Sequence, residues 1–126
     1  MMDKKFVFLN VGRLMMSVTV STKIDAEQLA DIFSRNVGNV VYSKSHVSGN
    51  IEALNMAGTS FFLRTNDTIG FALFSFYNGS EQEIDFGRIG GGSGLLNIRW
   101  GAGNKVEEKI LQDIKEAAEN MGATVS

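Results

Sequence analysis

The fold is decided by residues 94–121, which read GLLNIRWGAGNKVEEKILQDIKEAAENM. Residues 95–100 have the apolar composition of a short strand, and a Gly-Ala-Gly connection follows them. Asn104 can then cap a helix, with Glu107 completing a capping box, and Gly122 marks the expected helix end. The apolar residues of the helix recur every three or four positions and share one face: Val106, Ile110, Leu111, Ile114, Ala117, Ala118 and Met121. Because an isolated helix of this kind is marginally stable, the rest of the chain must supply a sheet on which it packs.

Strand patterns fill most of the chain before this helix. Residues 14–20 alternate between apolar and polar side chains, as in a strand with one buried face. Residues 69–77 are apolar on both faces, which predicts a central strand, and residues 83–89 alternate again. Asn78 and Gly79 lie between these two segments and favour a type I′ hairpin turn, because both accept positive φ angles. Shorter strand patterns occupy residues 6–9, 39–42 and 60–64, whereas residues 51–56 fit a strand or a helical turn equally well.

A short helix is predicted after the strand of residues 14–20. Asp25 and Gln28 have the spacing of a capping box, and Ile24 with Leu29 has the spacing of a hydrophobic staple. Gly38 supplies the stop. The apolar face of this helix is narrow, formed by Leu29, Ile32 and Phe33, so we expect it to pack against a larger neighbour.

The composition indicates one cytoplasmic domain spanning residues 1–126. A chain of 126 residues buries enough surface to form a core without cross-links, and the absence of cysteine excludes disulfides and cysteine metal sites. The formal charge of -2 gives no overall attraction to nucleic acid. The apolar runs are far shorter than the ~20 residues that span a bilayer, so neither nucleic acid nor a membrane is an expected partner.

These patterns predict an α+β fold with an antiparallel, curved sheet of about five to seven strands. One short N-terminal helix and a long C-terminal helix are expected to pack on one face of the sheet. Residues 1–12 are expected to form an extra N-terminal strand or a dimer arm, since pairing across a dimer would bury the apolar residues 6–9. Residues 10–12 fit either a hairpin turn or a bulge.

Two glycine-containing segments and three arginines are the candidate anion sites. Residues 90–94 can cradle a phosphate with free backbone N–H groups, although a hairpin connection explains the same glycines better. Residues 101–105, from Gly101 to Lys105, lie at a helix N-terminus, where the macrodipole attracts anions, but a structural connection is again favoured. The arginines converge on an anion only if their strands are adjacent: Arg64, Arg88 and Arg99.

No catalytic or metal-binding motif stands out. His46 is the only histidine and has no second histidine or cysteine with which to build a metal shell. Glu81, Glu83 and Asp85 occupy alternate positions, which is typical of the solvated face of a strand. We therefore expect a protein without enzymatic activity, metal or cofactor.

Aromatic residues are numerous in the predicted sheet. One long helix and one short helix do not need this much apolar bulk to cover them, so part of it is available to line a pocket between the sheet and the C-terminal helix. The candidate ligand-binding residues are Phe74, Phe76, Phe86, Trp100, Arg88 and Arg99.

The order of elements resembles the helix-grip arrangement, in which a curved antiparallel sheet wraps a C-terminal helix. The resemblance covers residues 71–121, with the Asn78-Gly79 hairpin, the 90–94 glycine loop and the Asn104-capped helix. START-like lipid-binding domains and TBP-like domains share this arrangement, as does a family of small uncharacterised bacterial α+β proteins. The resemblance implies a fold and carries no activity, because that family has no assigned site.

The expected function is therefore that of a binding domain that takes a small apolar ligand or a protein partner between the sheet and the C-terminal helix. One alternative is a homo-oligomeric structural or regulatory module, a homodimer in the simplest case, in which the same apolar surface forms subunit contacts. The other alternative is an anion or phosphate-ligand site formed by the arginines and the 101–105 helix N-terminus.

Overall fold

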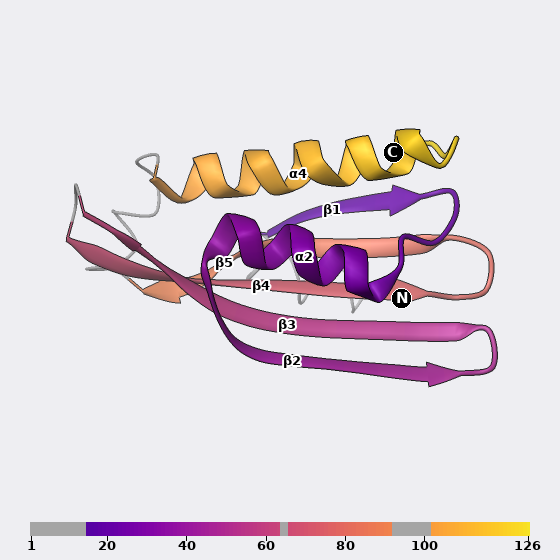
Figure 1. Ribbon diagram of the computed structural model, residues 1–126, viewed down its shortest axis with the longest axis horizontal. Coiled ribbons are helices and arrows are strands. Elements are labelled where there is room, and N and C mark those ends of the chain that lie inside the picture. Colours follow the sequence, from indigo (N-terminus) through magenta and orange to yellow (C-terminus); the bar gives the residue numbers. More distant parts are fainter. Residues whose placement is uncertain (1–14, 64–65, 92–101) are drawn as a thin grey trace.

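Five strands and two helices make up the described part of the chain, residues 15–63, 66–91 and 102–126 of a computed structural model. In chain order they are β1 (Met15–Val20), α2 (Ala26–Val37), β2 (Asn39–Ser48), β3 (Ile51–Phe62), β4 (Asp67–Tyr77), β5 (Gln82–Gly91) and α4 (Ala102–Asn120). The strands form one open antiparallel sheet in the order β1-β5-β4-β3-β2 (Figure 1). The α+β prediction is confirmed, and the strand count of the described residues is five, at the lower limit of the prediction. The predicted segments 1–12 and 95–100 lie outside the described residues.

Both helices pack on one face of the sheet, which we call the inner face (Figure 1). Ile110, Ile114 and Ala118 of α4 are completely buried, which confirms the middle of the predicted apolar stripe, whereas its last member, Met121, follows the helix end and is 41% exposed. Alternate strand residues enter the same core: Val18, Val20, Leu54, Met56, Ile69, Phe71, Leu73, Ile84 and Phe86. From α2 the core receives Leu29, Ile32, Phe33 and Val37. The opposite face of the sheet, the outer face, carries no helix among the described elements.

The first helix, α2, begins and ends where the sequence predicts, but one predicted contact is wrong. Asp25 is the N-cap residue and makes no side-chain capping hydrogen bond, so the capping box does not form. Ile24 and Leu29 are completely buried, as expected of a staple that places both residues in the core. Gly38 ends the helix with a φ of 105°, and its N–H donates to the Ser34 carbonyl at 2.9 Å. The start of α2 thus has the buried Ile24 and Leu29 of the predicted staple but no side-chain capping hydrogen bond.

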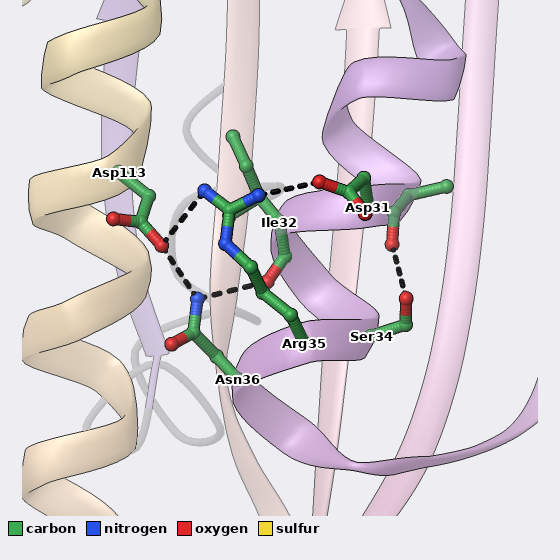
Figure 2. Close-up of polar contacts among 7 residues, drawn as sticks. Asp31, Ile32, Ser34, Arg35, Asn36 and Asp113 are labelled. Carbon is green, nitrogen blue, oxygen red and sulfur yellow. Dashed lines mark hydrogen bonds and ion pairs between the residues drawn. The ribbon is translucent and has the colours of Figure 1, made fainter.

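The two helices are joined by a polar cluster (Figure 2). Asp113 of α4 accepts a hydrogen bond from the Asn36 side chain at 2.8 Å and pairs with Arg35 at 3.2 Å. Arg35 also pairs with Asp31 of its own helix, and Asn36 donates to the Ile32 carbonyl at 2.8 Å. Only 14% of the Asp113 side chain is exposed, so these charge-assisted contacts hold the two helices in one relative orientation.

The β4–β5 hairpin forms as predicted, but its turn is not of type I′. Gly79 has a φ of 97°, whereas Asn78 is absent from the described residues with positive φ. Instead the Asn78 side-chain oxygen accepts the N–H groups of Ser80 and Glu81, each at 2.9 Å. This Asx-type arrangement uses the asparagine side chain to satisfy the turn backbone, which is the other reason for which asparagine is favoured in turns.

The hairpin of β2 and β3 is longer than the short strand patterns indicate. The register pairs Asn39 with Thr59 at one end and Ser48 with Ile51 at the other, with a bulge between Val40 and Tyr42. Gly58 lies where β3 passes the end of α2, and a Cβ there would approach the Asn39 carbonyl oxygen to 2.7 Å. A glycine is thus required by the close approach of two backbones.

The C-terminus protects one edge of the sheet. Gly122 ends α4 with a φ of 75°, and Ala123 N–H donates to the Ala118 carbonyl at 2.8 Å, as in a Schellman motif. The chain then returns to β1, where Thr19 and Ser126 exchange two backbone hydrogen bonds of 3.0 and 2.9 Å. The opposite edge strand, β2, is exposed along almost its whole length.

Candidate functional site

The candidate ligand-binding residues do not converge on one site. Phe86 and Arg88 project to the inner face. Phe74 and Phe76 project to the outer face, because successive residues of a strand point to opposite faces and their neighbour Leu73, which pairs with Phe86, points to the core. Arg99 and Trp100 lie outside the described residues, as does Arg64. The predicted set therefore splits into an inner pair and an outer pair.

The inner pair belongs to the protein core. Phe86 is completely buried in the same cluster as Ile110 and Ile114, so its surface is covered by protein side chains. Arg88 is 7% exposed, and its backbone N–H and Nε both donate to Glu107 Oε2 of α4, at 3.1 and 3.2 Å. Its Nη1 is buried and has no hydrogen-bond partner. This ion pair joins β5 to the first turns of α4.

Glu107 therefore has a role that differs from the predicted one. The sequence indicates a capping box of Asn104 and Glu107, but α4 begins at Ala102, so Asn104 lies inside the helix, and the Glu107 carboxylate accepts two hydrogen bonds from Arg88. Burial raises the pKa of the Glu107 carboxyl above its ordinary value of 4.5, although the charge of Arg88 and the hydrogen bonds from it act in the opposite direction. The loss of hydration thus outweighs the attraction of the guanidinium.

The raised pKa of Glu107 makes the free energy of unfolding depend on pH in a defined direction. Between pH 4.5 and the folded-state pKa, the folded protein binds this proton more tightly than the unfolded chain does. The contribution of Glu107 to the free energy of unfolding is thus greatest below pH 4.5 and falls as the pH rises through the folded-state pKa. Glu107→Gln lacks this proton, so the difference in unfolding free energy, wild type minus variant, is expected to fall as the pH increases. Urea denaturation of both proteins from about pH 3.5 to 7 measures this difference in unfolding free energy. A difference that rises with pH would contradict a raised pKa of Glu107.

The outer pair stands on a surface that the sequence did not single out. Of the Phe74 and Phe76 side chains, 38% and 47% are exposed, although a water-facing side of an antiparallel sheet is normally polar. Tyr42 on β2 is 51% exposed, and Ala53 and Ala57 of β3 lie between it and the phenylalanines. An apolar surface without a covering helix is typical of a contact site for another molecule.

Cross-strand pairing arranges the outer face in rows that run from β2 through β3, β4 and β5, and β1 continues the three rows below with Met15, Ser17 and Thr19. The Tyr42 row consists of Tyr42, Ala57, Ala72 and Gly87. The Lys44 row consists of Lys44, Asn55, Phe74 and Asp85. The His46 row consists of His46, Ala53, Phe76 and Glu83. Each of the last two rows has a lysine or a histidine on β2, a phenylalanine on β4 and a carboxylate on β5.

The charges on this face are separated by sign. Lys44 is exposed on β2, whereas Asp85 is half-buried and Glu83 is exposed on β5, with β3 and β4 between them. Within the part of the chain that the structure describes, no ion pair involves Lys44, Asp85 or Glu83. The outer face thus combines exposed phenylalanines on the central strand β4 with a lysine on the edge strand β2 and carboxylates on β5, whereas Ala72 and Gly87 of the Tyr42 row are buried.

A cavity of about 340 Å³ lies elsewhere, between the β2–β3 turn and the β4–β5 hairpin. Its wall includes Lys23, whose Nζ is 2.7 Å from Glu52 Oε1 and 5.7 Å from the centre of the Tyr77 ring. The hydrogen bond to Glu52 raises the pKa of the Lys23 amine, against the opposing effect of desolvation. This cation thus has two partners in the protein, Glu52 and the Tyr77 ring.

Residues 15–63, 66–91 and 102–126 contain no group of three or more His, Cys, Asp or Glu that could hold a metal ion. They also contain no helix that is both long and apolar enough to cross a bilayer.

The described residues define a class: an α+β domain with two helices on one face of a five-stranded antiparallel sheet and exposed phenylalanines on the other. Comparison with protein families, with curated proteins and with solved structures found no match to this chain.

Proposed function

We propose that this protein is a non-enzymatic binding module whose outer sheet face docks a polypeptide surface with an apolar centre and charged borders. The observation that carries the proposal is the exposure of Phe74 and Phe76 at the middle of a sheet face that carries no helix among the described elements. Exposed aromatic residues are enriched at the centres of protein–protein interfaces, and surrounding polar groups form the rim. The docking place thus differs from the expected one, which was the space between sheet and C-terminal helix.

The order of the described elements supports the helix-grip resemblance as part of this proposal. A strand, a helix, four antiparallel strands and a terminal helix follow one another, with the first strand added beside the last. In such an arrangement the helices cover one face and leave the other available for a partner. The remaining expectations, an enclosed apolar ligand and an anion at residues 101–105, stay predictions, since Arg99, Trp100 and Gly101 lie outside the described residues.

Site-specific photo-crosslinking tests the proposal. The photoreactive residue p-benzoylphenylalanine is introduced at position 76 of the full chain in living cells, and at position 116 as a control. Glu116 is an exposed residue of α4, on the helix surface directed away from the core. We expect covalent protein adducts from position 76, identified by mass spectrometry, and few or none from position 116.

Adducts to any polypeptide, including a second copy of this chain, agree with the proposal. Equal yields from positions 76 and 116 would show that the outer face has no preferred partner. An absence of protein adducts from position 76 would have the same meaning, and either result would contradict the proposal.

A further inference from the structure

We infer that residues 6–9 of the same chain, Phe-Val-Phe-Leu, dock on the outer face and cover the Tyr42 row at Ala72 and Gly87. The inference goes beyond the proposed function, which concerns the exposed part of the same face around Phe76. It starts from a burial that no described helix explains. Ala72 is 2% exposed and Gly87 is buried, although both helices lie on the inner face.

The neighbours of Ala72 within the sheet do not account for its burial. Its direct cross-strand partners are small, Ala57 on β3 and Gly87 on β5. Ala57 has the same side chain in the same row and lies between Ala72 and Tyr42, yet it is only half-buried. Phe74 is a neighbour of both alanines, along β4 in one case and diagonally across from β3 in the other. The alanine with more aromatic neighbours is thus the more exposed one, so another segment must lie over Ala72.

The connections of the described chain indicate which segment this is. Residues 1–14 lead into β1, whose first residue, Met15, pairs with Gly87 and continues the Tyr42 row on the outer face. The N-terminal part of the chain therefore joins the sheet at the end of the covered row. Residues 92–101, by contrast, connect β5 to α4, which lies on the inner face.

The distance from β1 to the covered row is within reach. β4 is the second strand from β1, so Ala72 lies roughly 10 Å from β1 at the usual spacing of neighbouring strands. The five residues between Leu9 and Met15 span up to roughly 17 Å when extended. Asn10 and Gly12 are among them and favour the change of direction that docking on the face requires.

The composition of the segment fits the surface that it would cover. Residues 6–9 are the longest apolar run outside the described ranges, and burial of such a run against the sheet is favourable. Lys4 and Lys5 directly precede it, whereas β5 carries the half-buried Asp85 and the exposed Glu83 on the outer face. Opposite charges beside an apolar contact help to orient the two surfaces.

An added edge strand would not produce the same burial. Pairing of residues 6–9 with the free edge of β1 would leave Gly87 one strand away and Ala72 two strands away. The C-terminus also occupies part of this edge, where Thr19 and Ser126 exchange two backbone hydrogen bonds. The burial of Ala72 therefore places the segment on the face of the sheet rather than at its edge.

The rate of thiol labelling tests the inference. The chain has no cysteine, so Ala72→Cys gives the full-length protein a single thiol, whose reaction with a maleimide is followed by mass spectrometry. We expect slow labelling, because the side chain at this position is covered. Addition of Phe6→Ser and Phe8→Ser removes the two rings of the segment and is expected to accelerate the reaction at least ~10-fold.

Two matched controls accompany this measurement. Ala53→Cys makes the same change on the half-buried part of the outer face, beside Phe76, and its labelling rate is expected to change less than ~2-fold when the two phenylalanines are replaced. Leu95→Ser with Leu96→Ser removes two large apolar residues from residues 92–101 and is expected to leave Ala72→Cys protected. Circular dichroism confirms that each variant folds, and Phe8→Ser alone replaces the double change if that one does not fold.

Protein concentration distinguishes a segment of the same chain from that of a second copy. Labelling of Ala72→Cys at about 1 and 100 μM protein is expected to proceed at the same rate constant, because an intramolecular contact does not depend on concentration. Protection that is lost on dilution would assign the cover to a second copy and would overturn the inference.

Three further results would overturn it: rapid labelling of Ala72→Cys in the otherwise unchanged chain, protection that survives the loss of both phenylalanines, or protection that is lost only with the leucine pair. The proposed function has a separate outcome. If position 76 yields protein crosslinks while the labelling result is negative, the docking surface stands and only the assignment of residues 6–9 is wrong. If labelling is as expected and position 76 yields no protein adducts, the segment covers its row and the proposed function is wrong.

Discussion

Glu107→Ala is expected to lower the free energy of unfolding by about 3–5 kcal/mol. The substitution leaves the buried Arg88 guanidinium without the hydrogen bond that its Nε donates to Glu107, and it leaves the Arg88 backbone N–H without its bond to the same carboxylate, while Nη1 has no partner to begin with. A buried charge without compensation is among the most destabilising changes that a single substitution can make. Urea denaturation at neutral pH measures the loss.

The neighbouring residue provides the control for this prediction. Glu108 is exposed, so Glu108→Ala is expected to change the free energy of unfolding by less than about 0.5 kcal/mol. The double variant Arg88→Met with Glu107→Met removes both charges and is expected to recover most of the stability, since apolar residues of similar volume often replace a buried ion pair without loss. Equal, small effects of Glu107→Ala and Glu108→Ala would show that water solvates Arg88.

Phe86→Ala is expected to lower the free energy of unfolding by about 3–5 kcal/mol. Phe86 is completely buried between the sheet and α4, next to Phe71 and Leu73 of the same core. Truncation removes the transfer free energy of the ring and leaves a cavity that close-packed neighbours fill only in part. Thermal or urea denaturation at a low, matched protein concentration measures the monomer alone.

The same truncation on the other face of the sheet is the matched comparison. Phe76 keeps 47% of its surface exposed in the monomer, so Phe76→Ala is expected to cost less than about 1 kcal/mol of monomer stability. Similar losses for both variants would mean that the outer face is covered within the monomer, and would argue against the assignment of the two faces.

The sequence alone predicted the elements whose signals are local. The three- to four-residue recurrence of Ile110, Ile114 and Ala118 identified the buried face of α4, and all three are completely buried. Gly38 and Gly122 identified two helix ends, because positive φ angles are intrinsic to glycine. The alternation of residues 14–20 and 83–89 identified the strands that became β1 and β5, since a strand with one buried face has a period of two.

Local patterns failed where the partner of a residue is distant in sequence. Glu107 has the spacing of a capping box, yet its partner is Arg88, which is 19 positions earlier in the chain. Residues 51–56 have no clear period, because Ala53 and Asn55 face outward while Leu54 and Met56 face the core. Small and polar outer residues therefore hid the longest strand among the described elements.

The candidate site shows the same division. Composition indicated a surplus of aromatic side chains, and parity within β4 separates Phe74 and Phe76 from the core residues beside them. Sequence could not show that Lys44, Asn55, Phe74 and Asp85 form one row, because the register of four separate strands brings them together. The amino-acid sequence by itself determined the two helices, their C-terminal ends and the alternation of β1 and β5, since backbone preference and periodicity act over a few neighbouring residues, whereas α4 begins at Ala102, before the predicted cap Asn104. Only the tertiary structure decided which face the helices cover and which charges share the other, since both depend on how distant strands pair.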